Sequence, residues 1–179
     1  MHELEKLADL IRKRNDIETE ITQVIGRPAQ IGHLGEYIAS MIFDIALEAS
    51  AVNKGYDGTF RTGLLAGKTV DVKWYAKREG LLDLREQDIP DYYLVLAGPA
   101  SPAGTSGGQT RPWYIDEVFV FPGKDIVQRL LGRGKGVGTA TSLTRDYWNE
   151  ARIYPTQTSR DLIIDNRQRE KIALFSSRK

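Results

Sequence analysis

The stretch 68–75 constrains the fold most, because apolar and polar side chains alternate along it. Successive side chains of a β-strand point to opposite faces of the sheet. Val70 and Val72 would therefore share one face of such a strand, while Asp71 and Lys73 would share the other. The pattern predicts a strand that holds a carboxylate and an ammonium group side by side.

A second carboxylate, Asp57, precedes this strand in the sequence. Residues 56–65 and 68–76 are predicted to form a hairpin around Ala66-Gly67. Asp57 would then reach the charged face from the preceding strand. Two carboxylates and a lysine in one place form a site for a hydrated divalent cation and a phosphate.

The rest of the chain predicts further helices and strands. They are helices at 2–25, 31–50, 124–131, 142–151 and 159–175, strands at 91–97 and 113–121, and a loop rich in Gly, Pro, Ser and Thr at 98–112. The second helix is apolar on two sides, so we expect it to lie between layers. The order predicts one α/β domain over residues 1–179, with its core at about 31–121 and C-terminal helices at about 124–175. Its small mixed β-sheet would be flanked by helices on both faces.

Composition narrows the class of protein without indicating a function. The chain has 179 residues, of which 41% are hydrophobic and 27% charged, as in an ordinary globular domain. No run of eighteen apolar residues is present, so no membrane span is expected. The chain has no cysteine, which excludes disulfides and thiol catalysis. Together with the charged N-terminus, which is unlike a signal peptide, this predicts a cytoplasmic protein.

The carboxylates and the lysine fit the hydrolysis of a phosphodiester. That reaction needs an activated water and neutralised phosphate charge, and Mg²⁺ held by one or two carboxylates supplies much of both. We predict Asp57, Asp71 and the backbone carbonyl of Val72 as its ligands, with Mn²⁺ as a substitute. Glu36, early in the second helix, would reach the metal directly or through water. Lys73 would stabilise transition-state charge or act as a base.

At these residues the chain resembles the PD-(D/E)xK nuclease superfamily, over roughly residues 31–97. The resemblance rests on Gly35-Glu36 with Ala39, on Tyr56-Asp57 at the position of the Pro-Asp of the family, and on Asp71-Val72-Lys73 at that of (D/E)xK. It implies a restriction-endonuclease-like fold and magnesium-dependent cleavage of DNA. It also implies a catalytic set of Glu36, Asp57, Asp71 and Lys73.

Two basic segments are predicted to contact DNA. Lys77 and Arg78 follow the strand, and a glycine-rich segment at 132–138 contains Arg133 and Lys135. Because the net charge is only +1, a DNA partner needs a local basic patch of this kind. The glycine-rich segment lacks the spacing of a P-loop, so no nucleotide cofactor is expected. Alternatively, it is an ordinary turn that ends a helix.

Each site residue also has a purely structural interpretation. Asp57-Gly58 can be a simple turn. Asp71 and Lys73 can be a weak ion pair on a solvated strand face. Glu36 can lie on the solvated face of its helix.

The conjunction of these motifs predicts a magnesium-dependent DNA endonuclease of the restriction type. A cut across both strands of double-stranded DNA needs two sites, so a homodimer is expected. The alternative is a catalytically inactive nucleic-acid-binding or scaffold subunit of a defence or repair complex. The acid–acid–lysine set favours the enzyme, because a pure binder does not need it.

Overall fold

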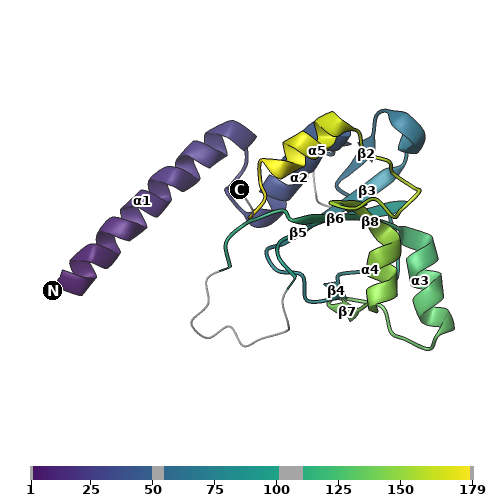
Figure 1. Ribbon diagram of the computed structural model, residues 1–179. Helices are drawn as coiled ribbons and strands as arrows, with labels where there is room; N and C mark the ends of the chain where they lie inside the picture. Colours follow the sequence, from purple (N-terminus) through teal and green to yellow (C-terminus); the bar gives the residue numbers. More distant parts are fainter. Residues whose placement is uncertain (1, 50–54, 101–110, 178–179) are drawn as a thin grey trace.

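The structure is a computed structural model that describes residues 2–49, 55–100 and 111–177. Figure 1 shows a central sheet with helices on both sides and a long N-terminal helix that extends away from it. The helices are α1 (His2–Ile25), α2 (Ile31–Phe43), the short 3₁₀ helix η1 (Gly63–Leu65), α3 (Gly123–Gly132), α4 (Arg145–Ala151) and α5 (Asn166–Ala173). The strands are β1 (Ile45–Leu47), β2 (Gly58–Phe60), β3 (Thr69–Tyr75), β4 (Leu81–Leu82), β5 (Tyr92–Ala97), β6 (Glu117–Pro122), β7 (Thr141–Ser142) and β8 (Arg152–Tyr154).

The main sheet is mixed, with the strand order β1-β2-β3-β5-β6-β8. Strands β3 and β5 run parallel, with Asp71 opposite Tyr93. The other neighbours in this sheet are antiparallel. A separate two-stranded ribbon joins β4 to β7. Strand β3 therefore lies inside the sheet, where it has hydrogen-bonded neighbours on both edges.

Two apolar clusters cover the two faces of this sheet. Val70, Val72 and Trp74 pack with α2 and α5 on one face. Tyr93 and the other outward side chains of β5 and β6 pack with α3, α4 and β4 on the opposite face. Helix α2 approaches β3 closely, since a Cβ atom on Gly35 would lie 3.0 Å from the Cβ of Trp74. The predicted small mixed sheet, flanked by helices on both faces, is confirmed.

The second helix is shorter than predicted. It ends at Phe43 instead of residue 50, because Asp44 takes a left-handed conformation with φ of 54°. Ile45–Leu47 then forms the edge strand β1, which pairs with β2. A short apolar run after a helix fits helical and strand periodicity equally well, and this caused the error.

The elements β6, α4 and α5 begin later than predicted. Strand β6 begins at Glu117 instead of residue 113, and α4 begins at Arg145 instead of residue 142. Helix α5 begins at Asn166 instead of residue 159, where Asp165 and Gln168 form a capping box. Strand β8 was not predicted. Most of the loop predicted at 98–112 lies outside the described residues. Among the described helices, none is long and apolar enough to cross a membrane.

Candidate active site

Strand β3 places Asp71 and Lys73 on the face of the sheet that α3 and α4 cover. The neighbouring apolar side chains of this strand point to the α2 face, which confirms the alternation predicted from the sequence. Asp71 is only 2% exposed. A carboxylate this deeply buried is rare in proteins unless it is paired. The interpretation of Asp71 as part of a solvated strand face is therefore wrong.

Two cations approach the Asp71 carboxylate. The Nζ atom of Lys73 lies 2.7 Å from Oδ1 of Asp71. The Nε atom of Arg85 lies 3.8 Å from Oδ2, and the Arg85 side chain is 51% exposed. Neither Asp71 oxygen has a hydrogen-bond partner of ordinary geometry among the described residues. The buried carboxylate is thus surrounded by positive charge but incompletely satisfied.

Asp57 reaches this site from the end of β2. Its backbone N–H donates to the carbonyl of Val70 at 2.9 Å, and Gly58 also lies opposite Val70. Two successive residues therefore face one partner, as in a β-bulge, which redirects a side chain. The carboxylate of Asp57 accepts a hydrogen bond of 2.7 Å from the N–H of Val72. Asp57 therefore directly precedes β2 with its carboxylate pointing toward β3, and it is not part of a simple turn.

The hydrogen bond that the Val72 N–H donates to Asp57 also shows which way the backbone carbonyl of Val72 points. In a strand, the N–H and C=O of one residue point to the same edge. Because the N–H of Val72 meets Asp57, the carbonyl of Val72 lies on the same edge as the Asp57 carboxylate. Gly58 allows this arrangement, since a Cβ atom there would lie 2.6 Å from the carbonyl oxygen of Ala46.

The surroundings of Asp71 stabilise its neutral form more than water does. Burial raises the pKa of Asp71 from 3.8 to about 6. Lys73 opposes this shift and Asp57 adds to it, since a nearby positive charge stabilises a carboxylate and a second negative charge destabilises it. Burial, with a smaller contribution from the second carboxylate, therefore outweighs Lys73, and the pKa of Asp71 stays above its ordinary value.

These residues fit a hydrated divalent cation. The buried carboxylate of Asp71 is incompletely satisfied, a second carboxylate lies beside it, and a backbone carbonyl faces the same edge. Mg²⁺ takes oxygen ligands and commonly keeps several waters, so two carboxylates suffice. Among the described residues, no group of three or more His, Cys, Asp or Glu side chains is placed to hold a metal. Water molecules would therefore have to complete the coordination.

Glu36 is not gathered with Asp57 and Asp71. It lies on α2 and forms an ion pair with Arg27. Helix α2 packs on the Val70 face of β3, which is opposite to the face that carries Asp71. The predicted role of Glu36 as a third metal-binding acid therefore has no support in the contacts of the described residues.

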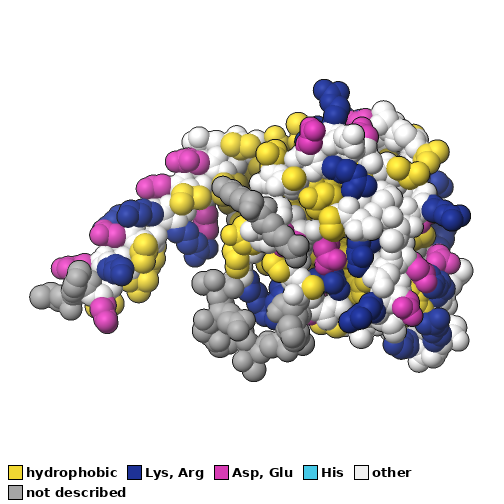
Figure 2. All heavy atoms as spheres, in the orientation of Figure 1, with side chains coloured by type: hydrophobic (Ala, Val, Ile, Leu, Met, Phe, Trp, Pro, Cys, Tyr) yellow, Lys and Arg dark blue, Asp and Glu magenta, His cyan; other side chains and the backbone are white. Residues whose placement is uncertain are grey.

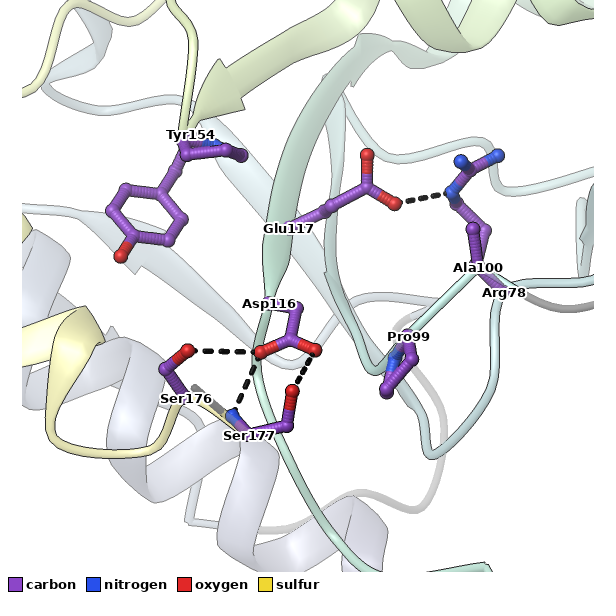
Figure 3. A pocket seen from close by; sticks show the side chains of 9 residues that line it. Arg78, Pro99, Ala100, Asp116, Glu117, Tyr154, Ser176 and Ser177 are labelled. Carbon is purple, nitrogen blue, oxygen red and sulfur yellow. Dashed lines mark hydrogen bonds and ion pairs between the residues drawn. The ribbon is translucent and has the colours of Figure 1, made fainter. Parts of the chain in front are cut away.

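Lys77 and Arg78 are partly buried and have carboxylate partners. Nζ of Lys77 lies 3.0 Å from Glu79. The guanidinium of Arg78 pairs with Glu117 and lies over the rings of Phe119 and Trp148. Figure 3 shows Arg78 and Glu117 pointing toward each other at one side of a cavity of about 430 Å³. Their charges are locally neutralised, which does not fit the predicted role as DNA contacts.

Arg133 and Lys135 remain exposed beyond the end of α3. The N–H groups of Arg133 and Lys135 both donate to the carbonyl of Leu130 at 3.0 Å. The segment is therefore a helix-ending turn, as the alternative interpretation held. The guanidinium of Arg133 lies 5.2 Å from the ring centre of Tyr147. A contact with DNA stays a prediction for these two cations, which lie in the layer of helices on the Asp71 side.

The sequence did not indicate Arg85. Its backbone N–H donates to the hydroxyl of Tyr93 at 3.0 Å, which holds the segment after β4 over the site. Tyr75 fixes the same segment, because its hydroxyl donates to the carboxylate of Asp83 at 3.2 Å. Both tyrosines belong to predicted strands, but only their contacts across the fold show which residue they hold.

No protein-family model matches the chain, and no curated protein matches it.

The raised pKa of Asp71 predicts a pH-dependent effect of Asp71→Asn on stability in chelator. Asp71 binds its proton more tightly in the folded protein than in the unfolded chain. The free energy of unfolding therefore falls as the pH rises from 3.8, the ordinary pKa, through about 6, the pKa in the folded protein. The amide lacks that charge. We expect the variant to be more stable than the wild type by about 3 kcal/mol at pH 8 and by less than about 1 kcal/mol at pH 4.

Urea unfolding at the two pH values measures this difference. Asp125→Asn, at an exposed carboxylate on α3, is the control and should change stability little at either pH. A gain for Asp71→Asn that is the same at pH 4 and pH 8 would contradict the assigned pKa shift.

Proposed function

We propose that the protein is a metal-dependent nuclease that hydrolyses phosphodiester bonds of DNA. The observation that carries the proposal is the convergence of Asp57 and Lys73 on the buried Asp71 carboxylate, whose pKa stays raised despite the close ion pair. A structural ion pair on the surface has no need for a second carboxylate that raises the pKa of the first. A cation site gains from both carboxylates, because a divalent ion removes their mutual repulsion.

The proposal includes membership of the PD-(D/E)xK superfamily. Its support is the order of the parts: helix α2, then the antiparallel strands β1, β2 and β3, with one acid at the edge of β2 and Asp-x-Lys on β3. Strand β5, parallel to β3, follows.

In this proposal Asp57, Asp71 and the carbonyl of Val72 hold Mg²⁺, and Mn²⁺ can replace it. When bound, the ion would supply Lewis acidity toward the phosphate and lower the pKa of a bound water. Lys73 and Arg85 add positive charge beside the carboxylates. Lys73 would stabilise the negative charge that develops on the phosphate in the transition state. The more exposed Arg85 would hold the phosphate in place.

Double-stranded DNA would approach the face of the sheet that α3 and α4 cover, because Asp71, Arg85, Arg133 and Lys135 all lie in or on that layer. In the absence of a cation, the two carboxylates repel phosphate. We therefore expect divalent ions to tighten DNA binding as well as to support cleavage. Ca²⁺ should support binding with little cleavage, since its coordination is looser.

The second candidate function is a catalytically inactive nucleic-acid-binding or scaffold subunit. The ion pair of 2.7 Å between Lys73 and Asp71 favours it, because Lys73 already compensates part of the buried charge. The two functions differ in their need for metal. A scaffold binds its partner equally well with chelator or with Mg²⁺.

Asp71→Asn and Lys73→Ala separate metal binding from chemistry. We expect each to lower nicking of plasmid DNA in Mg²⁺ by at least about 100-fold, as the loss of one charge-stabilising group typically does. Calorimetric titration with Mg²⁺ should show weaker binding for Asp71→Asn and almost unchanged affinity for Lys73→Ala.

Lys124→Ala, at an exposed position of α3, is the control and should cut like the wild type. Full activity of either site variant would contradict the assignment. An inactive wild type whose DNA affinity ignores divalent ions would favour the scaffold.

The salt dependence of DNA binding tests which cations face the DNA. Replacing Arg133 and Lys135 together by Ala should reduce the slope of log affinity against log salt by roughly two, because two phosphate contacts are lost. Lys77→Ala should leave the slope unchanged, because Glu79 already neutralises Lys77. An equal loss of slope in both variants, measured by fluorescence anisotropy, would refute this division.

A further inference from the structure

Helix α1 exposes an apolar surface that nothing in the described part of the chain covers. Figure 1 shows this 24-residue helix extending away from the sheet and its layers. Figure 2 shows hydrophobic side chains along the extended helix. Six of them are between 50% and 71% exposed: Leu4, Leu7, Leu10, Ile11, Ile17 and Val24. A surface helix normally buries its apolar stripe, so α1 lacks a partner within the described part of the chain.

The stripe follows a heptad pattern. Leu7, Leu10, Arg14, Ile17, Ile21 and Val24 are separated alternately by three and four residues. Five of these six side chains are apolar. Alternating spacings of three and four are the a and d positions through which two helices pair in a coiled coil. The single charged member, Arg14, donates to Glu18 of its own helix at 2.9 Å.

The same stripe forms one wall of a groove of about 660 Å³. Leu10, Ile17 and Ile21 line it on α1, and Pro112 and Trp113 lie on the other side. Trp113 is itself 44% exposed. The groove extends the apolar surface of α1 to the body of the protein, so a partner would contact both.

The charges on α1 indicate what kind of partner fits. Residues 2–14 carry four cations against three acids and are net positive, whereas residues 15–25 contain three acids and neither lysine nor arginine. The cations are Lys6, Arg12, Lys13 and Arg14, and the acids of the first half are Glu3, Glu5 and Asp9. A second α1 in reversed direction would place each net-positive half beside a net-negative half. A parallel pair would place Arg14 next to the Arg14 of the other copy, and like charges at that position repel. The helix is thus complementary to its own reversed copy.

We propose that α1 is a dimerisation helix, on which α1 of a second copy of this chain packs antiparallel. Leu10 of one copy then lies opposite Ile21 of the other, and Lys13 lies opposite Glu20. This inference rests on α1 and the groove beside it, and it does not require the proposed nuclease function. If both are correct, the dimer carries two Asp71 sites, which a cut of both DNA strands needs.

The molar mass in solution tests the dimer. Light scattering should give twice the 20.1 kDa of one chain, and Leu10→Glu with Ile17→Glu should halve the mass. Asn15→Glu with Gln23→Glu adds the same two charges on the other side of α1 and should leave the dimer intact. A wild type with the mass of one chain, or a dimer that survives the changes at Leu10 and Ile17, would overturn the proposal.

Introduced cysteines test the direction of the helices, since the chain has none of its own. Residues 10 and 21 of one straight helix are about 16 Å apart, too far for a disulfide within the chain. Oxidation of a variant with both Leu10→Cys and Ile21→Cys should therefore give covalent dimers on a non-reducing gel. Leu10→Cys alone should give none. Covalent dimers from Leu10→Cys alone would show parallel helices and overturn the antiparallel arrangement.

Discussion

The buried carboxylate of Asp71 is the constraint on which the candidate site depends. A carboxylate removed from water loses its hydration and must be compensated by charge or hydrogen bonds. Lys73 supplies a close ion pair and Arg85 a longer one, but Asp57 brings a second negative charge to the same place. The compensation is incomplete, and the pKa of Asp71 stays near 6. In the proposed function, a divalent cation between the carboxylates completes it.

The sheet builds this arrangement from backbone geometry. Strand β3 has neighbours on both edges, so the direction of Asp71 is fixed by the alternation of a rigid strand. Gly58 lets β2 approach β1 closely, and the bulge before it turns Asp57 toward the N–H of Val72. The parallel partner β5 places Tyr93 opposite Asp71, and its hydroxyl holds the backbone of Arg85.

Local patterns sufficed to predict β3 and the hairpin, and with them the meeting of Asp57, Asp71 and Lys73. They failed where distant contacts decide. Arg85 lies at the site because of Tyr93, and Arg78 is neutralised by Glu117, which is 39 residues away in the chain. The edge strand β1 was missed because its three residues continue the apolar pattern of α2. Glu36 was predicted at the site but lies away from it, because α2 covers the face of the sheet opposite to Asp71.

The position of a bound metal tests the central claim most directly. Crystals grown with Mn²⁺ allow the ion to be located by its anomalous scattering. We predict one peak between the carboxylates of Asp57 and Asp71, about 2 Å from an oxygen of each, with Lys73 beside it. A map without a peak there, in which Asp71 keeps Lys73 as its nearest charged partner, would contradict the claim that the buried carboxylate is a metal ligand.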